Sequence, residues 1–202
     1  MYSISKRLFD ITLSASGIIL LLPIMLIVGA TIKITSPGPM IYRAKRIGFQ
    51  GNLFIMFKFR SMELFSDRYA SSTSITDKRV TNFGRFIRRF KIDEFPQLFN
   101  VFFGQMSIVG PRPELEKYTS LYNKNQKRIL SVKPGMTDFS SIYFRNLNQM
   151  IGDIDPDKDF EERFLDKKNS LRLKYVSEMS FRTDLKIIIM TIIVIFKSKN
   201  AS

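Results

Sequence analysis

An uncharged run from Ile11 to Ile32 constrains this chain more than any other feature of its sequence. The run is about as long as a helix that crosses a bilayer, which needs roughly 20 mainly apolar residues. A secretory signal peptide would be shorter and would end at a small-residue cleavage site, whereas this run continues past Ala30. We therefore expect these residues to enter a membrane as a helix.

Basic residues lie on both sides of the run, so the distribution of Lys and Arg gives no single orientation for a simple span. Lys6 and Arg7 precede the run, and Lys33 follows it. Pro23 lies near its middle, where it removes a helical hydrogen bond, so we expect a kink near Leu22. A re-entrant helix, which bends and returns to the face that it entered, satisfies both basic flanks. A kinked conventional span is the alternative.

A shorter apolar run lies near the other end of the chain, from Leu185 to Phe196, and Lys197 and Lys199 follow it. It is too short to span a bilayer comfortably. Its pattern fits a helix that lies in the membrane interface beside anionic lipid, and it fits a buried core helix equally well.

Net charge and missing residue types limit the chemistry of the chain. Its 32 Lys and Arg against 18 Asp and Glu give a formal charge of +14, so we expect anionic partners. There is no His and no Cys, which excludes an imidazole base, a thiol nucleophile and a zinc–thiolate site. Any catalysis must use carboxylates, Lys, Arg, Tyr or Ser.

The segment Ser36–Pro39 ends the hydrophobic element, because its prolines and glycine cannot continue a helix. We therefore divide the chain into an N-terminal membrane segment with its exit turn, residues 1–39, and one further domain, residues 40–202. No internal repeat is present.

The second domain combines short strands with several helices. Residues 40–44 and Phe54–Arg60 are predicted as strands, and the two-residue alternation would put Lys58 and Arg60 on one face. A polar loop is expected at 63–82, a further loop at Pro134–Gly135, and helices at 84–103, with an interruption near Pro96, at 113–130 and at 160–179. The predicted fold class is therefore α+β and mainly helical.

The stretch most informative about chemistry contains two adjacent carboxylates, Asp93 and Glu94, after several cations. The simplest interpretation is a surface ion pair, with Arg89 and Asp93 four residues apart on a helix. The chemical interpretation is that cations hold a polyphosphate, a hard divalent ion such as Mg²⁺ screens its charge, and a carboxylate attacks phosphorus. Consecutive helical side chains diverge by roughly 100 degrees, so one carboxylate could hold the metal while the other faces the phosphate.

A second candidate element is Gly110–Pro113, in which Arg112 lies on a backbone stiffened by two prolines. Such an arginine is pre-positioned for bidentate contact with phosphate. The alternative is a turn that leads into a helix, with Pro113 in its first turn.

Four segments, in this order and spacing, resemble the bacterial sugar transferases, specifically the small PglC-like monotopic phosphoglycosyl transferases. They are Lys58–Met62, Asp93–Val101, Met106–Pro113 and Lys133–Thr137. The resemblance extends over nearly the whole chain, from the basic N-terminus to the C-terminal helix.

The resemblance implies an enzyme that moves a sugar 1-phosphate from a UDP-sugar to undecaprenyl phosphate and releases UMP, the first membrane step of bacterial glycan assembly. It implies that Asp93 is the nucleophile, which forms a phosphosugar–aspartyl intermediate, and that Glu94 and Asp93 hold Mg²⁺. The residues expected to bind phosphate are Arg88, Arg112, Lys58 and Arg60.

The resemblance also implies where the protein lies. A re-entrant helix would make it a monotopic protein of the bacterial inner membrane, with the catalytic domain on the cytoplasmic face, phospholipid as a partner and interfacial amphipathic helices. A homo-oligomer stays an open alternative, and no recognised nucleic-acid-binding motif occurs in the sequence.

The chain departs from the family pattern at three places. Leu22 precedes Pro23 where members often have Ser, and Gln105 replaces a common acidic residue. Thr137–Asp138–Phe139 stands where relatives commonly read Thr-Gly-Trp, which predicts a difference in the sugar or nucleotide pocket.

Two alternative functions remain open from the sequence. Asp93 could act as a general base for direct transfer in a ternary complex. The chain could also be a non-catalytic, basic, membrane-anchored adaptor.

Overall fold

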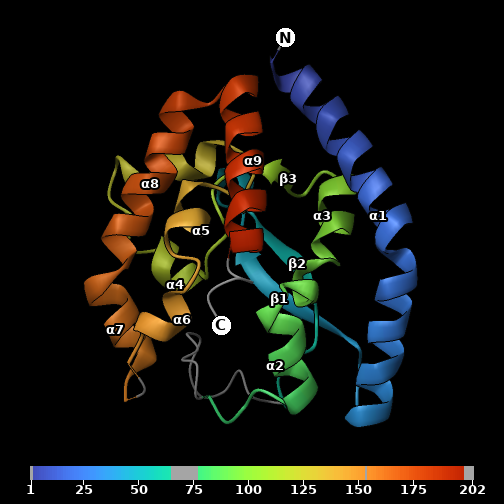
Figure 1. Ribbon diagram of the computed structural model, residues 1–202. Helices are drawn as coiled ribbons and strands as arrows, with labels where there is room; N and C mark the ends of the chain where they lie inside the picture. Colours follow the sequence, from blue (N-terminus) through green and yellow to red (C-terminus); the bar gives the residue numbers. More distant parts are fainter. Residues whose placement is uncertain (1, 65–76, 153, 198–202) are drawn as a thin grey trace.

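The N-terminal half of the uncharged run and its C-terminal half form one helix, α1 (Tyr2–Thr35), which continues through Pro23. The computed structural model describes residues 2–64, 77–152 and 154–197, and α1 is the one described helix long and apolar enough to cross a membrane (Figure 1). The ribbon of α1 bends part-way along its length but does not divide, so the predicted break into two helices is absent.

Helix α1 stays continuous although Pro23 removes one of its hydrogen bonds, because it packs against the rest of the fold on both sides of the proline. On one side, a Cβ atom at Gly17 would lie 3.2 Å from the Leu98 side chain, so α1 is in close contact with Leu98 there. On the other side, Val28 and Ile32 are buried.

After the exit turn the chain forms an antiparallel hairpin of β1 (Ile41–Ile47) and β2 (Leu53–Phe59), joined through the short 3-10 helix η1 (Phe49–Gly51). Both predicted strands are confirmed, and β1 extends beyond the expected segment. Ala44 pairs with Met56, and this pair is buried because the alternation of the strands points both side chains inward.

Helix α2 (Asn82–Arg89), the 3-10 turn η3 (Ile92–Glu94) and helix α3 (Gln97–Phe102) follow. The predicted interrupted helix is confirmed, but the interruption begins before Pro96. Lys91 adopts a left-handed conformation with φ of 58°, which turns the chain after α2.

Two short strands, β3 (Ser107–Val109) and β4 (Gly135–Thr137), pair in parallel. The connection between them contains only α4 (Glu116–Thr119) and η4 (Gln126–Ser131), so the longer helix predicted over 113–130 is wrong.

The β3–β4 pair depends on two glycines. A Cβ atom on Gly135 would lie 2.1 Å from the backbone nitrogen of Gly110, a distance that no side chain can tolerate. This close approach of two backbones makes Gly135 the start of a strand, where the sequence predicts a loop.

The remaining described chain is helical, with α5 (Phe139–Tyr143), α6 (Leu147–Met150), α7 (Pro156–Arg163), α8 (Leu165–Glu178) and α9 (Phe181–Lys197). Helices α7 and α8 confirm the prediction over 160–179. Helix α9 contains the second apolar run and has two faces: Ile187 is buried beside Tyr175, whereas Ile189 and Ile192 are exposed.

Of the loop predicted at 63–82, only the ends are described. The backbone nitrogen of Glu63 donates to the carbonyl oxygen of Arg79 at 2.9 Å, and residues 65–76 lie outside the described residues.

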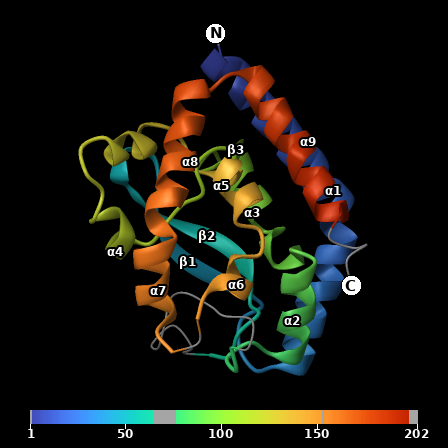
Figure 2. The same ribbon diagram turned by 60° about the vertical axis from the view of Figure 1, so that its left-hand side comes forward.

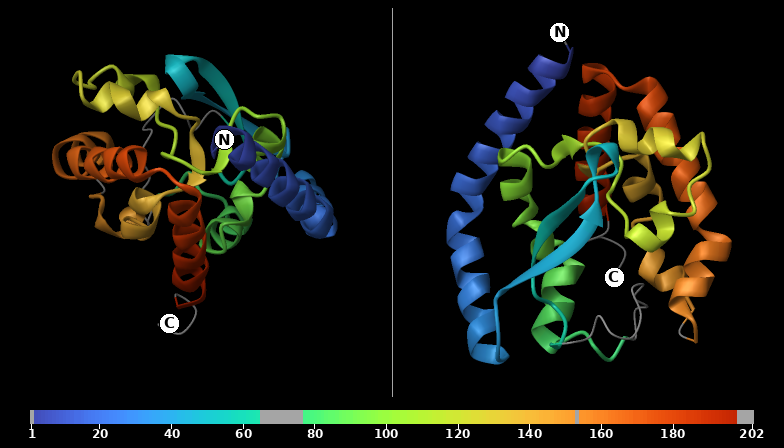
Figure 3. Two further views of the ribbon diagram at one scale, coloured as in Figure 1. Left: turned by 90° about the horizontal axis from the view of Figure 1, so that it is seen from above. Right: turned by 180° about the vertical axis from the view of Figure 1, so that it is seen from behind.

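Helix α1 lies along one flank of the molecule, and α7 and α8 lie along the opposite flank (Figures 1 and 3). Helix α8 leads into α9 at the end where α1 begins (Figure 2), and there Lys6 Nζ pairs with Asp184 Oδ2 at 2.7 Å. From that end, α1 and α9 diverge. The inner face of α1 shares a hydrophobic cluster with Phe59 and Ile87, so the N-terminal helix and the domain at 40–202 have a common core.

Candidate active site

The two adjacent carboxylates lie on the short turn η3, between α2 and α3. Asp93 is buried, with 6% of its surface exposed, and its Oδ1 atom has no hydrogen-bond partner among the described residues. Asp93 and Glu94 are consecutive on a tight 3-10 turn, a geometry in which neighbouring side chains point in different directions.

Glu94 brings together three parts of the chain. Its Oε1 atom accepts a hydrogen bond from Arg112 Nη2 at 2.5 Å and lies 3.5 Å from Lys58 Nζ. Lys58 comes from β2, and Arg112 comes from the loop after β3. Three of the residues predicted for the site, far apart in the sequence, therefore meet at one carboxylate.

Burial and charge act differently on the two carboxylates. Burial alone would raise the pKa of Glu94, but the positive charges of Arg112 and Lys58 outweigh it and hold this pKa far below its ordinary value. At Asp93 burial prevails over the charge of Lys58, and the pKa is raised. Burial also lowers the pKa of Lys58, although Glu94 opposes that shift.

Arg88, on α2, belongs to the same electrostatic environment, because its charge is among those that lower the pKa of Asp93. The charge of Lys91 lowers the pKa of both carboxylates, although no sequence motif singles this residue out. Its position next to η3 and its left-handed backbone place it there.

Arg60 lies outside this cluster, in contrast to the prediction that it shares a face with Lys58. Its guanidinium donates to the carbonyl oxygens of Pro37 at 2.5 Å and Ser36 at 2.9 Å, and to Ser36 Oγ at 2.7 Å. Strand β2 ends at Phe59, so the alternation that would put Arg60 beside Lys58 does not continue to it. Arg60 instead fixes the turn that leaves α1.

The backbone around Arg112 is held by the segment that departs from the family pattern. Arg112 Nη1 donates to the carbonyl oxygen of Met136 at 2.8 Å, and its backbone nitrogen approaches Asp138 Oδ2 at 3.4 Å. Asp138 is fully buried and caps α5 by accepting from the backbone nitrogen of Ser141 at 2.7 Å. The sequence difference at 137–139 therefore lies beside the candidate site.

Gln105, another departure from the family pattern, has a structural contact. Its Oε1 atom accepts from Asn100 Nδ2 at 2.7 Å, and Asn100 in turn accepts from the backbone nitrogen of Phe57 at 2.9 Å. These bonds tie α3 to β2 and keep η3 next to Lys58.

The carboxylates offer a partial metal site. No group of three or more His, Cys, Asp or Glu side chains that could hold a metal occurs in the described parts of the chain. Mg²⁺, however, is usually held by one or two carboxylates together with substrate phosphates and water. The unpartnered buried oxygen of Asp93 beside the ionised Glu94 fits such a site.

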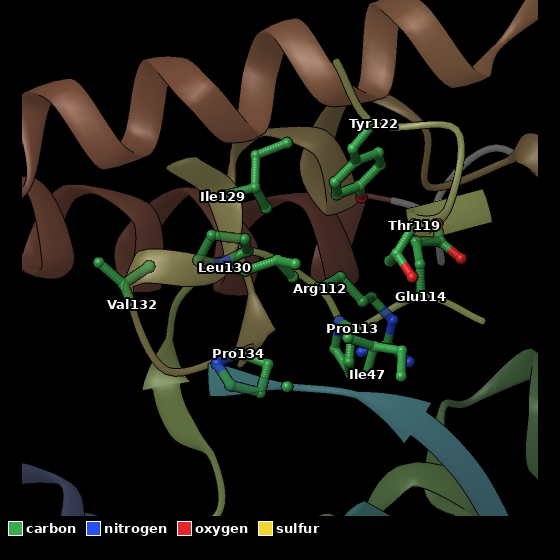
Figure 4. Close-up of a pocket in the computed structure, with 12 residues that line it drawn as sticks. Ile47, Arg112, Pro113, Glu114, Thr119, Tyr122, Ile129, Leu130, Val132 and Pro134 are labelled. Carbon is green, nitrogen blue, oxygen red and sulfur yellow. The ribbon is translucent and has the colours of Figure 1, made fainter. Parts of the chain in front are cut away.

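A small pocket lies beside the Arg112 loop, whose residues form part of its wall (Figure 4). Its walls are largely apolar and include Ile47, Pro113 and Ile129. Arg112 also lines it, but neither Asp93 nor Glu94 is among its described lining residues. We therefore assign the candidate chemistry to the charged cluster and not to this pocket.

A family model and three proteins that match this chain all represent sugar transferases. The family model described as "Bacterial sugar transferase" matches residues 1–198. A UDP-glucose:undecaprenyl-phosphate glucose-1-phosphate transferase of Klebsiella pneumoniae is 40% identical over 202 residues, which cover 97% of this chain and 41% of the relative. A protein of the same name from Xanthomonas campestris pv. campestris is 35% identical over 205 residues, covering 99% and 40%.

A shorter relative, the uncharacterized sugar transferase EpsL of Bacillus subtilis (strain 168), is 37% identical over 190 residues, which cover 94% of this chain and 86% of the relative. The chain thus spans about two fifths of the length of the first two relatives and most of the length of the third.

Proposed function

This chain belongs to the bacterial sugar transferase family, and from that membership we propose that it transfers a sugar 1-phosphate from a UDP-sugar to undecaprenyl phosphate and releases UMP. The observation that carries the proposal is the convergence of Lys58, Glu94 and Arg112 beside a buried carboxylate, Asp93. Such a site can bind a diphosphate and deliver an oxygen nucleophile to it.

In the proposed mechanism, a carboxylate oxygen of Asp93 forms a bond to the β-phosphorus of the UDP-sugar. The bond from that phosphorus to the bridging oxygen breaks, and UMP leaves with the electron pair. A phosphate oxygen of undecaprenyl phosphate then attacks the same phosphorus, and the Asp93 carboxylate leaves. Burial supports this role, because a poorly solvated carboxylate is a stronger nucleophile than a hydrated one.

The cations would bind and compensate phosphate charge. Arg112 has a fork of donors suited to phosphate, whereas Lys58 and Arg88 supply positive charge close to Asp93. Glu94 and Asp93 would hold Mg²⁺. When bound, that ion would neutralise charge on the phosphate oxygens and on the leaving UMP.

A second mechanism deserves a direct test, because the raised pKa of Asp93 also suits a general base. In that case Asp93 would accept a proton from the lipid phosphate, which would attack the UDP-sugar directly. The family and reaction stay the same, but UMP would appear only when the lipid acceptor is present.

The proposed location is the cytoplasmic face of the bacterial inner membrane, with phospholipid against the exposed apolar side of α1. Contacts at both ends of α1 support a monotopic arrangement. Near its start, Arg7 donates to the carbonyl oxygens of Val101 and Phe102 at 2.7 Å each, and near its end Ile32 packs in the cluster that contains Phe59. Contacts of both helix ends with one domain favour an arrangement in which α1 and that domain stay on the same side of the bilayer.

The deciding experiment mixes the protein with Mg²⁺ and a panel of UDP-sugars without lipid acceptor. Up to about one equivalent of UMP per active site and a phosphosugar adduct on the peptide containing Asp93 are expected. If a UDP-sugar that turns over with undecaprenyl phosphate gives neither UMP nor adduct without the lipid, the general-base mechanism replaces the covalent one. A chain that gives no UMP from any UDP-sugar, with or without lipid, is the adaptor.

A further inference from the structure

A buried charged cluster lies directly behind the Arg112 loop and has no part in the mechanism above. We call Glu114, Lys168 and Arg172 the Glu114 clamp. Glu114 Oε1 accepts from Arg172 Nη2 at 2.5 Å and from Lys168 Nζ at 3.1 Å. Arg172 has 0% of its surface exposed, and its Nη1 atom donates to Asn169 Oδ1 at 3.0 Å and to the Tyr122 hydroxyl at 3.4 Å.

The clamp is ionised but is a poor source of stability. Burial would raise the pKa of Glu114, yet Lys168 and Arg172 outweigh it and lower this pKa to about 2. Removing charges from water is costly, and well-packed apolar residues often replace a buried ion pair without loss of stability. The best-attested use of such a pair is to fix one arrangement of the chain, so the arrangement that it fixes is informative.

What the clamp fixes is the position of a short, stiff segment. Glu114 lies two residues after Arg112, and its carbonyl oxygen accepts from the backbone nitrogen of Ile47 at 3.0 Å. On the other side of Arg112, the carbonyl oxygen of Pro111 accepts from the backbone nitrogen of Gly135 at 3.0 Å. Pro111 and Pro113 restrict the backbone between these anchors, so a shift at Glu114 moves Arg112 with it.

The clamp therefore connects α8 to the charged site. Figure 4 shows Arg112 and Glu114 close together on this loop, on either side of Pro113. From here the Arg112 side chain reaches Met136 and Glu94. Helix α8 carries Lys168 and Arg172, which both contact Glu114, two residues after Arg112.

We propose that Glu114 and Arg172 are positioning residues, which hold the Pro111–Pro113 segment so that Arg112 reaches Glu94 and the substrate phosphate. The inference rests on the proposed function for its kinetic consequence. Its structural part, that the Arg112 guanidinium loses its fixed place when the clamp is broken, is independent of any activity.

A double-mutant cycle between the clamp and Arg112 tests the kinetic part. Glu114→Gln keeps the shape of the side chain and removes its charge, and it should slow UMP release about tenfold, since small displacements of positioning groups cost one to two orders of magnitude. In an Arg112→Ala background the same change should cost less than about twofold, because the group that it positions is gone.

Two further variants separate positioning from folding. Glu114→Gln combined with Lys168→Met and Arg172→Gln removes all three charges of the clamp, so no unpaired charge stays there, and it keeps the test available if Glu114→Gln alone does not fold. Asp157→Asn is the matched control, because it removes a carboxylate that pairs with Lys117 Nζ at 2.7 Å, in the same half of the molecule, without contact to the Arg112 loop. It should leave UMP release within about twofold of wild type.

The structural part is read from the guanidinium resonance of Arg112 in isotope-labelled protein in nanodiscs, identified by its absence from Arg112→Lys. An arginine held by Glu94 and Met136 gives a distinct resonance, which should move to the position of a solvent-averaged arginine in Glu114→Gln and stay in place in Asp157→Asn. An unchanged resonance in a folded Glu114→Gln variant, or equal effects of Glu114→Gln with and without Arg112, would overturn the proposal. If the wild type releases no UMP from any UDP-sugar, the proposed function fails, while the resonance still decides the clamp.

Discussion

At the scale of single residues, Asp93 and Glu94 are neighbours with opposite pKa shifts, upward at Asp93 and downward at Glu94. Carboxylates whose environments push their pKa values apart are suited to different roles. We predict that Asp93→Asn reduces transfer about 10³-fold or more, because the amide keeps the shape but cannot attack phosphorus. UMP release assayed on folded, membrane-bound protein checks this, and turnover near the wild-type rate would rule out Asp93 as the nucleophile.

The raised pKa of Asp93 also predicts the pH dependence of the reaction. The nucleophile must be deprotonated, so activity should fall as the pH drops through a pKa that burial has raised above the ordinary value of 3.8. Lys58 lowers this pKa, so Lys58→Met should move the acid limb of kcat/KM to higher pH. Lys45→Met, on the neighbouring strand β1, is a charge-matched control that should leave the limb in place. A limb that moves to lower pH in Lys58→Met contradicts the prediction.

Glu94→Gln tests the metal. Losing an anionic oxygen ligand should raise the Mg²⁺ concentration needed for half-maximal activity by about tenfold, since changes in the ligand set commonly cost one to two orders of magnitude. A Mg²⁺ titration of UMP release gives the measurement. Full wild-type activity in the presence of a chelator would show that no divalent ion takes part.

Residue types and order in the sequence were enough to select Lys58, Glu94 and Arg112, which the fold brings to one carboxylate. The expected shared face of Lys58 and Arg60 differs from the structure because the end of a strand cannot be located to one residue from its pattern. The role of Asp138 can be predicted only in part from the sequence. An aspartate three residues before Ser141 fits a helix cap, but its approach to Arg112 depends on the β3–β4 pairing.

At the scale of elements, the parallel β3–β4 pair holds the Arg112 loop and depends on the close approach of Gly110 and Gly135. We predict that Gly135→Ala destabilises the protein by about 2 to 3 kcal/mol or more, because the added methyl group meets backbone atoms that cannot move aside. Gly152→Ala is the control, since a Cβ atom there would lie an ordinary 3.7 Å from Asp159 Oδ2. Thermal unfolding of the two variants in detergent makes the comparison, and equal midpoints would count against the essential role of this contact.

Elements with a clear periodic pattern were predictable, whereas those made by distant contacts were not. The two hairpin strands and α8 follow from alternation and helical spacing. Helix α1 stays whole across Pro23 because of tertiary packing on both sides of the proline, which no local pattern reports. Strand β4 exists only because another backbone lies beside it.

At the scale of the whole molecule, contacts at both ends of α1 predict that Ser5 and Ser177 lie on the same side of the membrane. Single cysteines at these positions should react with a membrane-impermeant thiol reagent only after the cytoplasmic face is opened, and the chain has no native Cys to interfere. Labelling at position 5 from outside intact cells would establish a spanning helix instead.

The division of the chain at residue 39 can be tested at the same scale. Helix α1 contributes Met25, Val28 and Ile32 to the cluster that contains Phe59 and Ile87. A chain that begins at residue 40 would expose this face, so we expect it to aggregate instead of forming a soluble domain. A monodisperse, cooperatively unfolding fragment would show that the two parts are separate folding units.

The contacts of α1 also join residues that the ribosome makes at widely separated times. Asp10 Oδ1 accepts from Ser107 Oγ, 97 residues further along the chain. At 5 to 20 residues per second, the ribosome takes about 5 to 20 s to make that partner after Asp10 itself, and still longer passes before it leaves the exit tunnel. During this interval helix α1 has already been made, but its Asp10 carboxylate does not yet have the Ser107 hydroxyl as a partner. In the proposed membrane arrangement, α1 is therefore synthesised, and can insert, before the domain exists whose residues later bind it.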